Sequence, residues 1–162
     1  MVKIIIVDEN DNKIGLKERG TLDNDNDIYR VSGLWVVNSK GDILLAQRGF
    51  LKTNHLGEWG IAVSGTVEES ESYEENIIKE AEEEIGLKDC NFIKSKKERV
   101  RRKYNYFRQL FLCTIDIDID DFVIQEEELE GLRWYTRDEL RKELKETPEK
   151  FTFTVKEFLE KY

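Results

Sequence analysis

Histidine, cysteine and proline are nearly missing from this 162-residue sequence, which has one, two and one of them respectively. The two cysteines, Cys90 and Cys113, show no CxxC spacing, and no histidines cluster near them. Disulfide-rich scaffolds and structural zinc sites need several such residues at short spacings. Both classes are therefore disfavoured. The sequence instead predicts two free, unreactive thiols, as is usual in the cytosol.

Excess positive charge and long apolar runs are also lacking. The formal net charge is -9 and the mean hydropathy is -0.62. Nucleic-acid polymers and anionic membranes attract basic surfaces, so neither is an expected partner. A polyanionic small molecule stays open, because local cations or metal ions reverse the field inside one cleft. The apolar run near the N-terminus is too short for a signal peptide or a membrane span, which favours a cytoplasmic location.

What is present predicts one folded domain over residues 1–162, with residues 1–30 as an N-terminal strand or hairpin extension. Short β-branched or alternating runs predict strands near residues 3–7, 13–17, 31–37, 43–47, 59–64, 106–119 and 132–135. Residues 49–57 are expected to form an irregular loop. Capping boxes and apolar periodicity predict helices over residues 73–85, 137–144 and 154–161. This order favours an α+β fold, a mixed α/β/α sandwich.

The stretch Gly65–Leu87 reads GTVEESESYEENIIKEAEEEIGL and carries most of the chemistry. Within its helix, Glu80, Glu83 and Glu84 occupy an arc of roughly 100° beside the apolar stripe. Three carboxylates so placed need cations, and oxygen-only ligands suit Mg²⁺ or Mn²⁺. Such ions polarise a phosphoryl oxygen and activate a water. Lys79 stands one turn before Glu83 and is expected to pair with it.

In its full spacing this stretch resembles the Nudix box, G-x5-E-x7-R-E-U-x-E-E-x-G-U, in which U is apolar. Chance produces such a match with a probability on the order of 10⁻⁵, which disfavours a merely solvated acidic helix face. The resemblance implies an α/β/α sandwich with a mixed sheet, in which residues 65–87 form a loop–helix–loop. It also implies Mg²⁺-dependent hydrolysis of a nucleoside diphosphate derivative or a similar small organic diphosphate. Homodimers are common in the family, so the oligomeric state stays open.

Carried over by position, the resemblance assigns roles to residues of the box. The implied metal ligands are Glu80, Glu83 and Glu84, with the carbonyl of Gly65. Glu83, Glu80 and Lys79 are the catalytic candidates. Lys79 departs from the family pattern, which has arginine there, and Arg and Lys are not interchangeable at a bidentate site.

Within the superfamily, the chain resembles the branch related to isopentenyl-diphosphate isomerase. The similarity lies in the opening VDENDNKIG and the hairpin ILLAQRGFLKTNHLGEWGIAVSG. By position, Arg48 and Lys52 match the basic residues that hold the diphosphate in that branch. The isomerase itself needs a catalytic cysteine and several histidines. Here Ser64 stands at the cysteine position, Thr66 replaces a histidine, and His55 is the only histidine.

Four further side chains outside the box are candidates. Trp59 is interpreted mainly as a core residue, with stacking on a base or sugar of the substrate as the alternative. The acidic run at residues 126–130 is either a solvated loop or the source of a distal general base, for which Glu127 and Glu128 are the candidates. His55 lacks an evident partner and is interpreted as a loop residue.

Three functions stay open at this level. A diphosphate hydrolase is favoured. An isomerase-like enzyme is disfavoured by Ser64 and by the lack of histidines. A non-catalytic diphosphate-binding module is the third, and Lys79 is the only hint of it.

Overall fold

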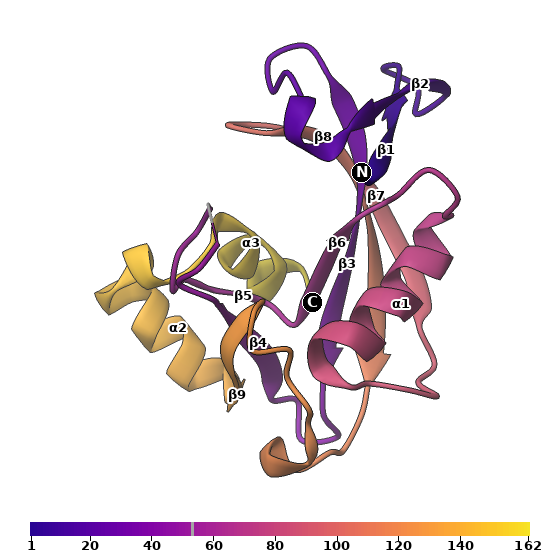
Figure 1. Ribbon diagram of the computed structural model, residues 1–162. Coiled ribbons are helices and arrows are strands. Elements are labelled where there is room, and N and C mark those ends of the chain that lie inside the picture. The colour runs from indigo at the N-terminus through magenta and orange to yellow at the C-terminus, as the bar shows by residue number, and fades with distance from the viewer. Residues whose placement is uncertain (53) are drawn as a thin grey trace.

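One mixed β-sheet with helices on both of its faces makes up the protein (Figure 1). The computed structural model describes residues 1–52 and 54–162, and over these ranges it has nine strands and three α-helices. Thr53, in the loop expected over residues 49–57, lies outside the described residues. The strands are β1 (Lys3–Val7), β2 (Lys13–Glu18), β3 (Ile28–Val37), β4 (Ile43–Arg48), β5 (Trp59–Ile61), β6 (Val63–Thr66), β7 (Ile93–Arg101), β8 (Asn105–Thr114) and β9 (Leu129–Tyr135). The helices are α1 (Tyr73–Ile85), α2 (Arg137–Glu146) and α3 (Phe153–Lys161), and short 3₁₀ turns cover Arg19–Thr21, Ile119–Asp121 and Pro148–Lys150.

Strand β3 is the centre of the sheet, because both of its edges are paired. One edge pairs in parallel with β8 over residues 29–37. The other edge pairs antiparallel with β1, then with β6, then with β4. Strand β9 joins β4 and β7 joins β8, both antiparallel. The result is the mixed sheet that the α+β prediction requires.

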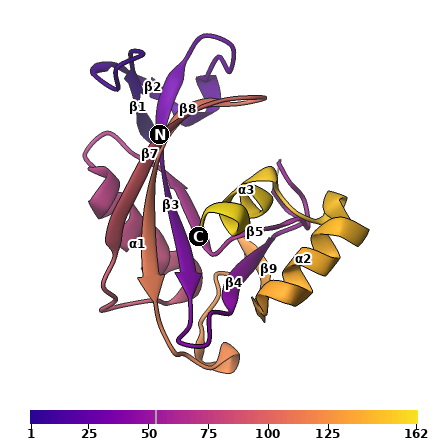
Figure 2. The ribbon, with the colours of Figure 1, turned by 180° about the vertical axis from the view of Figure 1, so that it is seen from behind.

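The apolar residues of β4 alternate between two hydrophobic clusters, which places the helices on opposite faces of the sheet. Leu44 and Ala46 share a cluster with the buried side of α1. Ile43 and Leu45 share the other with buried residues of α2 and α3. Figures 1 and 2 show α1 on one side of the sheet and α2 with α3 on the other. The α/β/α arrangement predicted from the sequence is therefore confirmed.

Local signals determine both ends of α1. The Ser72 hydroxyl accepts a hydrogen bond from the Glu75 amide at 3.1 Å, and the Glu75 carboxylate accepts one from the Ser72 amide at 2.8 Å. This is the capping box expected from the sequence. Gly86 ends the helix with a φ of 68°, in the left-handed region that glycine adopts without steric cost.

Between residues 93 and 119, one strand was not predicted and another was predicted too long. Strand β7 was not expected, because its sequence IKSKKERVR is mostly charged and only Val100 is buried. It lies at the edge of the sheet, where polar side chains face solvent. Conversely, the alternating residues 115–119 are not a strand: β8 ends at Thr114, level with the last residue of β3. One acidic side chain there stabilises a turn instead, because Asp116 accepts hydrogen bonds from the amide and the hydroxyl of Ser39 in the turn between β3 and β4.

The prediction of two free thiols is wrong, because Cys90 and Cys113 form a disulfide. Their separation of 23 residues gives no motif in the sequence. The pairing of β7 with β8 sets Ile93 opposite Leu112 and so brings the two cysteines together. Disulfides are rare in the cytosol, so thiol content no longer supports a cytoplasmic location. Within the described ranges, no helix is long and apolar enough to span a membrane.

A buried carboxylate fastens the β1–β2 hairpin to the rest of the fold. The side chain of Asp11 is 6% exposed and lies 2.7 Å from Arg30 Nε and 2.6 Å from Lys97 Nζ. The Tyr73 hydroxyl donates to it at 3.1 Å. Burial alone would raise the pKa of Asp11, but the hydrogen bonds and charges of Lys97 and Arg30 outweigh burial and leave the pKa below its usual value.

Asp11→Asn is therefore expected to lower the free energy of unfolding by about 1.5–3 kcal/mol at pH 7, because it removes the charge-assisted hydrogen bonds to the half-buried Arg30 and the exposed Lys97. A carboxyl whose pKa is lowered by folding stabilises the fold above its unfolded pKa of about 3.9, and this contribution disappears as the pH falls through the folded pKa. Urea unfolding at pH 7 and below pH 4 measures both effects. Glu9→Gln, which removes an exposed partner of Arg99 and Arg101, is the control. An equal loss in that control would contradict a special role for Asp11.

Candidate functional site

Gly65 on β6 allows helix α1 to approach the strand closely. A Cβ atom at this position would lie 2.8 Å from Glu80 Oε1 and closer still to the adjoining carbons of the Glu80 side chain. Only glycine therefore leaves room for the Glu80 carboxylate against the strand. The backbone carbonyl of residue 65 and the helix carboxylates are thus held at one place by the packing of α1 on the sheet.

Lys79 organises the loop that precedes the helix rather than the helix face itself. Its ammonium lies 2.5 Å from Glu71 Oε1, 3.3 Å from Glu68 Oε1 and 3.7 Å from Glu80 Oε1. The expected pairing with Glu83 does not occur. Helical side chains lean toward the N-terminus of their helix, so Lys79 reaches back to the loop instead of forward by one turn. Its pKa is raised: burial alone would lower it, but the surrounding carboxylates outweigh burial.

The Glu71 carboxylate is fixed from three sides. Besides Lys79, it accepts hydrogen bonds from the Asn76 side-chain amide at 2.8 Å and from the Glu68 backbone amide at 3.0 Å. Asn76 is fully buried and also donates to the carbonyl of Thr66 at 3.1 Å. These bonds tie the loop to α1 and so determine where Glu80 lies.

The carboxylates of the box line one open cavity of about 390 Å³. Its acidic wall consists of Glu68, Glu80, Glu83, Glu84 and Glu128, with Gly65 beside them. Burial raises the pKa of Glu84 to about 8, and the negative charges of Glu80 and Glu128 add to the shift. Burial likewise raises the pKa of Glu80. Without a cation, this wall holds more negative charge than its surroundings stabilise.

The donor set fits a hard divalent cation. All donors along this wall are oxygens, and the space that Gly65 leaves open lies beside them. Over residues 1–52 and 54–162, no three acidic, histidine or cysteine side chains already stand close enough to hold an ion. A cation would therefore draw the carboxylates inward, and it would offset the repulsion that raises the pKa of Glu84.

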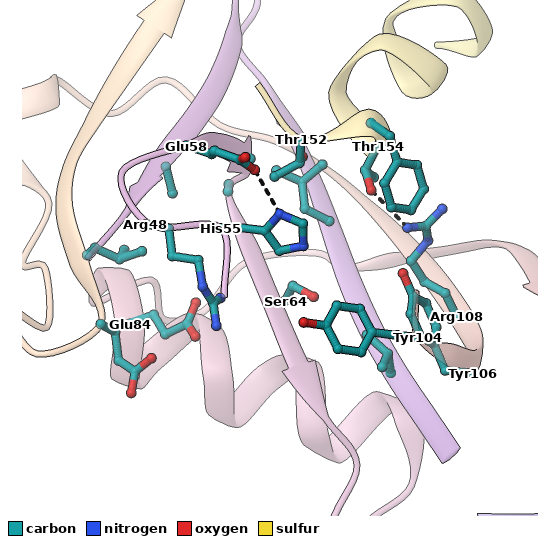
Figure 3. Close-up of a pocket in the computed structure, with 18 residues that line it drawn as sticks. Arg48, His55, Glu58, Ser64, Glu84, Tyr104, Tyr106, Arg108, Thr152 and Thr154 are labelled. Atoms are coloured by element: carbon teal, nitrogen blue, oxygen red, sulfur yellow. Dashed lines mark hydrogen bonds and ion pairs between the residues drawn. The ribbon is translucent and has the colours of Figure 1, made fainter. Parts of the chain in front are cut away.

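Two basic residues, which the sequence predicted to bind a diphosphate, also line this cavity. Arg48, at the end of β4, lines the cavity, and its Nε donates to the carbonyl of Asn54 at 2.5 Å. Lys52 also lines it and forms an ion pair with Glu128. Figure 3 shows Arg48 extending toward Glu84. Anionic and cationic groups thus line the same cavity, and Lys52 and Glu128 are in direct contact there.

The remaining candidates separate into those that line the cavity and those that do not. Glu128 lines it, whereas Glu127 is exposed and is not part of its lining. Trp59 packs edge-on against Tyr135, with ring centroids 5.8 Å apart, and does not line the cavity. This packing agrees with the interpretation of Trp59 as a core residue and does not support a role in substrate binding.

Several residues around the site were not expected from the sequence. His55 lines the cavity, and its Nδ1 lies 2.8 Å from Glu58 Oε2, so the interpretation that it lacks a partner is wrong. Tyr104 and Tyr106 line the cavity from the β7–β8 hairpin. No local signal indicated Tyr104, because strand β7 and therefore the β7–β8 hairpin were not predicted. Tyr106 and Arg108 lie in a strand that was predicted, but nothing in the sequence distinguishes them from other residues of that strand.

Comparison with known proteins places the chain in a family. The NUDIX domain matches residues 28–155, which is most of the chain. Isopentenyl-diphosphate Delta-isomerase 1 of Photorhabdus laumondii is 29% identical over 54% of this chain and 50% of its own length. Prenyl-diphosphate phosphatase of Methanosarcina mazei is 28% identical over 93% of this chain and 89% of its own length. The chain spans about half the length of some of the curated relatives that it matches.

A solved structure shows the same fold over nearly the whole chain. The crystal structure of a Deinococcus radiodurans protein superposes with a TM-score of 0.84 and covers 98% of both chains at 20% identity. At this identity the likeness establishes the fold and leaves the activity to be argued from the site.

Proposed function

Because this chain belongs to the NUDIX domain family, we propose that it is an Mg²⁺-dependent hydrolase, with Mn²⁺ as a substitute ion. Its substrate is a nucleoside diphosphate derivative or a similar small organic diphosphate, in which it cleaves the diphosphate linkage. The observation that carries the proposal is one cavity lined both by box carboxylates and by Arg48 with Lys52. A diphosphate needs both, because metal ions neutralise part of its charge and fixed donors hold the rest.

Each residue has a defined task in this proposal. Glu80, Glu83, Glu84 and the carbonyl of Gly65 would hold the metal. When bound, Mg²⁺ would polarise a phosphoryl oxygen and favour ionisation of a water. Glu128, which lines the same cavity as Glu84, is the better placed of the two distal carboxylates to accept the proton of that water, because Glu127 lies outside the cavity.

Lys79 acts as a positioning residue, since it touches Glu71 and Glu80 rather than the substrate. Arg48 and Lys52 bind the diphosphate oxygens. Lys52 is paired with Glu128 in this structure. Binding of an anionic diphosphate would therefore compete for Lys52 and release the Glu128 carboxylate.

The test is a panel of nucleotide and isoprenoid diphosphates, each incubated with and without Mg²⁺. Mg²⁺-dependent release of a new monophosphate product is the expected result. Migration of a double bond in isopentenyl diphosphate would favour an isomerase-like enzyme instead. Binding without turnover would favour a non-catalytic module. Ser64 at the position of the isomerase cysteine argues against the second outcome, because a hydroxyl shares its proton less readily than a thiol.

Lys79→Ala is expected to lower kcat/KM by about 10–100-fold, the usual loss for a residue that orients a metal ligand. Lys79→Arg should preserve or raise activity, because the planar guanidinium can hold Glu71 and Glu80 together. The Mg²⁺ concentration at half-maximal rate should rise in Lys79→Ala, which a purely structural role would not require. Lys88→Ala is the control, since Lys88 pairs with the exposed Glu82. An inactive wild type beside an active Lys79→Arg variant would point to the binding module.

A further inference from the structure

A histidine and a glutamate form a pair beside the cavity, and the chemistry proposed above does not use it. His55 is the only histidine of the chain. Its Nδ1 lies 2.8 Å from Glu58 Oε2, and because a carboxylate only accepts hydrogen bonds, the ring nitrogen is the donor. The other ring nitrogen, Nε2, is turned away from Glu58 and toward the interior of the cavity (Figure 3). The pair therefore presents one imidazole nitrogen to a ligand.

The backbone at His55 is held in an uncommon conformation. Its φ of 54° lies in the left-handed region, which few residues other than glycine adopt. Arg48 Nε donates to the carbonyl of Asn54 at 2.5 Å, and the Tyr104 hydroxyl donates to the Asn54 side chain. The Glu58 amide donates to the carbonyl of His55 at 3.1 Å. Such conformations persist where the surroundings determine them, often beside ligands. The position of the imidazole is thus fixed by its neighbours.

His55 lines the same cavity of about 390 Å³ as Arg48, Lys52 and the box carboxylates. Its side chain is 37% exposed, so a ligand in the cavity can reach the ring. Arg48, Lys52 and His55 belong to one short stretch of chain, from the end of β4 into the loop after it. A diphosphate has terminal oxygens on both phosphorus atoms, and one guanidinium with one ammonium leaves some of them without a donor. A third nitrogen donor is therefore useful in this cavity.

The charges around the ring determine when Nε2 carries a proton. Besides the box residues, Arg19 and Lys52, the charged side chains that share a cavity with His55 are Glu58, Glu128, Arg48, Arg102, Lys103 and Arg108. Glu128 is paired with Lys52 and Arg108 with Glu98, which offsets their charges. Glu58 touches the ring at Nδ1. A phosphate bound at Nε2 would place a second anion on the opposite side of the ring, and both anions stabilise an imidazolium.

We propose that His55, oriented by Glu58, donates a hydrogen bond from Nε2 to a phosphoryl oxygen of the bound diphosphate. The inference rests on the proposed function, because it adds a third donor to the same diphosphate site. Glu58 is the positioning residue, since it touches the ring and not the substrate. The donating ring is the imidazolium, which bonds to Glu58 and to the phosphate at the same time. Its contribution to affinity is therefore present while the ring is protonated and is lost as rising pH removes that proton.

The test measures the Kd of methylenediphosphonate, a diphosphate analogue that is not hydrolysed, by calorimetry with Mg²⁺ at pH 6 and pH 9. His55→Asn should raise the Kd by about 10-fold at pH 6, the effect of one partly exposed charge-assisted hydrogen bond, and by clearly less at pH 9. The analogue and the box carboxylates titrate in both proteins, so the ratio of the two Kd values isolates His55. Asparagine also adopts the left-handed region, so the loop should keep its course.

Glu58→Gln tests the positioning role. Glutamine still accepts from Nδ1 through its amide oxygen but removes the charge that stabilises the imidazolium, so the Kd at pH 6 should rise by about 3-fold. Adding Glu58→Gln to His55→Asn should cause no further rise, because Glu58 acts through the ring. A purely structural role would instead give losses that add and that are equal at both pH values. Glu146→Gln, an exposed substitution in α2, is the matched control for loss of an acidic side chain.

The outcomes separate this inference from the proposed function. An equal Kd ratio at both pH values, or additive losses in the double variant, would overturn the inference and leave the hydrolase intact. With a hydrolysed substrate, His55→Asn should raise KM and change kcat by less than about 2-fold, because the contact already exists in the bound ground state. If no diphosphate is hydrolysed, the proposed function fails, and the titration still decides the inference. A pH-dependent Kd ratio would then support it, and absence of analogue binding to the wild type would overturn it.

Discussion

Glu83→Gln and Glu84→Gln are each expected to lower kcat by roughly 10³-fold or more while the protein stays folded. Glutamine keeps the size of the side chain but removes the charge that a metal ligand contributes, and bound metal supplies several kcal/mol of transition-state stabilisation. Steady-state rates over a range of Mg²⁺ concentrations measure the effect. Circular dichroism checks the fold.

The same helix provides a matched control. Glu82 adjoins Glu83 in sequence, but it is exposed, pairs with Lys88 and does not line the cavity. Glu82→Gln should therefore retain activity close to that of the wild type. If Glu83→Gln or Glu84→Gln also kept near wild-type rates at saturating Mg²⁺, the helix would not hold the catalytic metal.

Glu84→Gln should also change how stability depends on pH in the metal-free protein. Folding raises the pKa of Glu84 to about 8, above its unfolded value of about 4.3. The folded state then binds the proton more tightly, so the fold loses stability as the pH rises from about 4.3 through 8. Thermal melts without metal should show the variant more stable than the wild type at pH 8 and equal to it near pH 4. Added Mg²⁺ should stabilise the wild type more.

Local signals explain why the loop and helix of the site were predictable. The ends of α1 depend on Ser72 and Gly86, which flank the helix, and on Glu75 in its first turn. The candidate role of Arg48 came from its positional match to the basic residues of the isomerase branch, and Arg48 does line the cavity with the box carboxylates. Most strands were predictable from apolar residues that alternate or are β-branched, because such patterns indicate burial of a strand face; the alternating residues 115–119, which form no strand, are the exception.

Features that depend on distant pairing were not predictable from one sequence. Strand β7 is charged because it forms an edge of the sheet. It therefore lacks the alternation of apolar residues that burial of one face produces. Missing β7 concealed the hairpin with Tyr104 and, through the pairing of Ile93 with Leu112, the disulfide. The choice between Glu127 and Glu128 needed the course of the loop before β9, which no local signal specifies.

Arg48→Ala is expected to raise KM for accepted diphosphates by about 10–100-fold, the factor for one charge-assisted hydrogen bond of about 1.5–3 kcal/mol. The double variant with Lys52→Ala should reach the upper end of this range or exceed it, because both cations face the same cavity. Calorimetry should find the Mg²⁺ affinity without substrate little changed, since neither residue is among the proposed metal ligands. Lys40→Ala, in the exposed turn between β3 and β4, controls for loss of positive charge from an acidic protein.

The single variants of Arg48 and Lys52 should also change different kinetic properties. Arg48 additionally holds the carbonyl of Asn54, so Arg48→Lys tests whether charge alone suffices: a point charge should restore part of KM but not the bidentate contact. Lys52 restrains Glu128, so Lys52→Ala leaves that carboxylate free and should alter the pH profile of kcat as well as KM. Wild-type kinetics in the double variant would mean that both cations belong to the surface and that the diphosphate is held elsewhere.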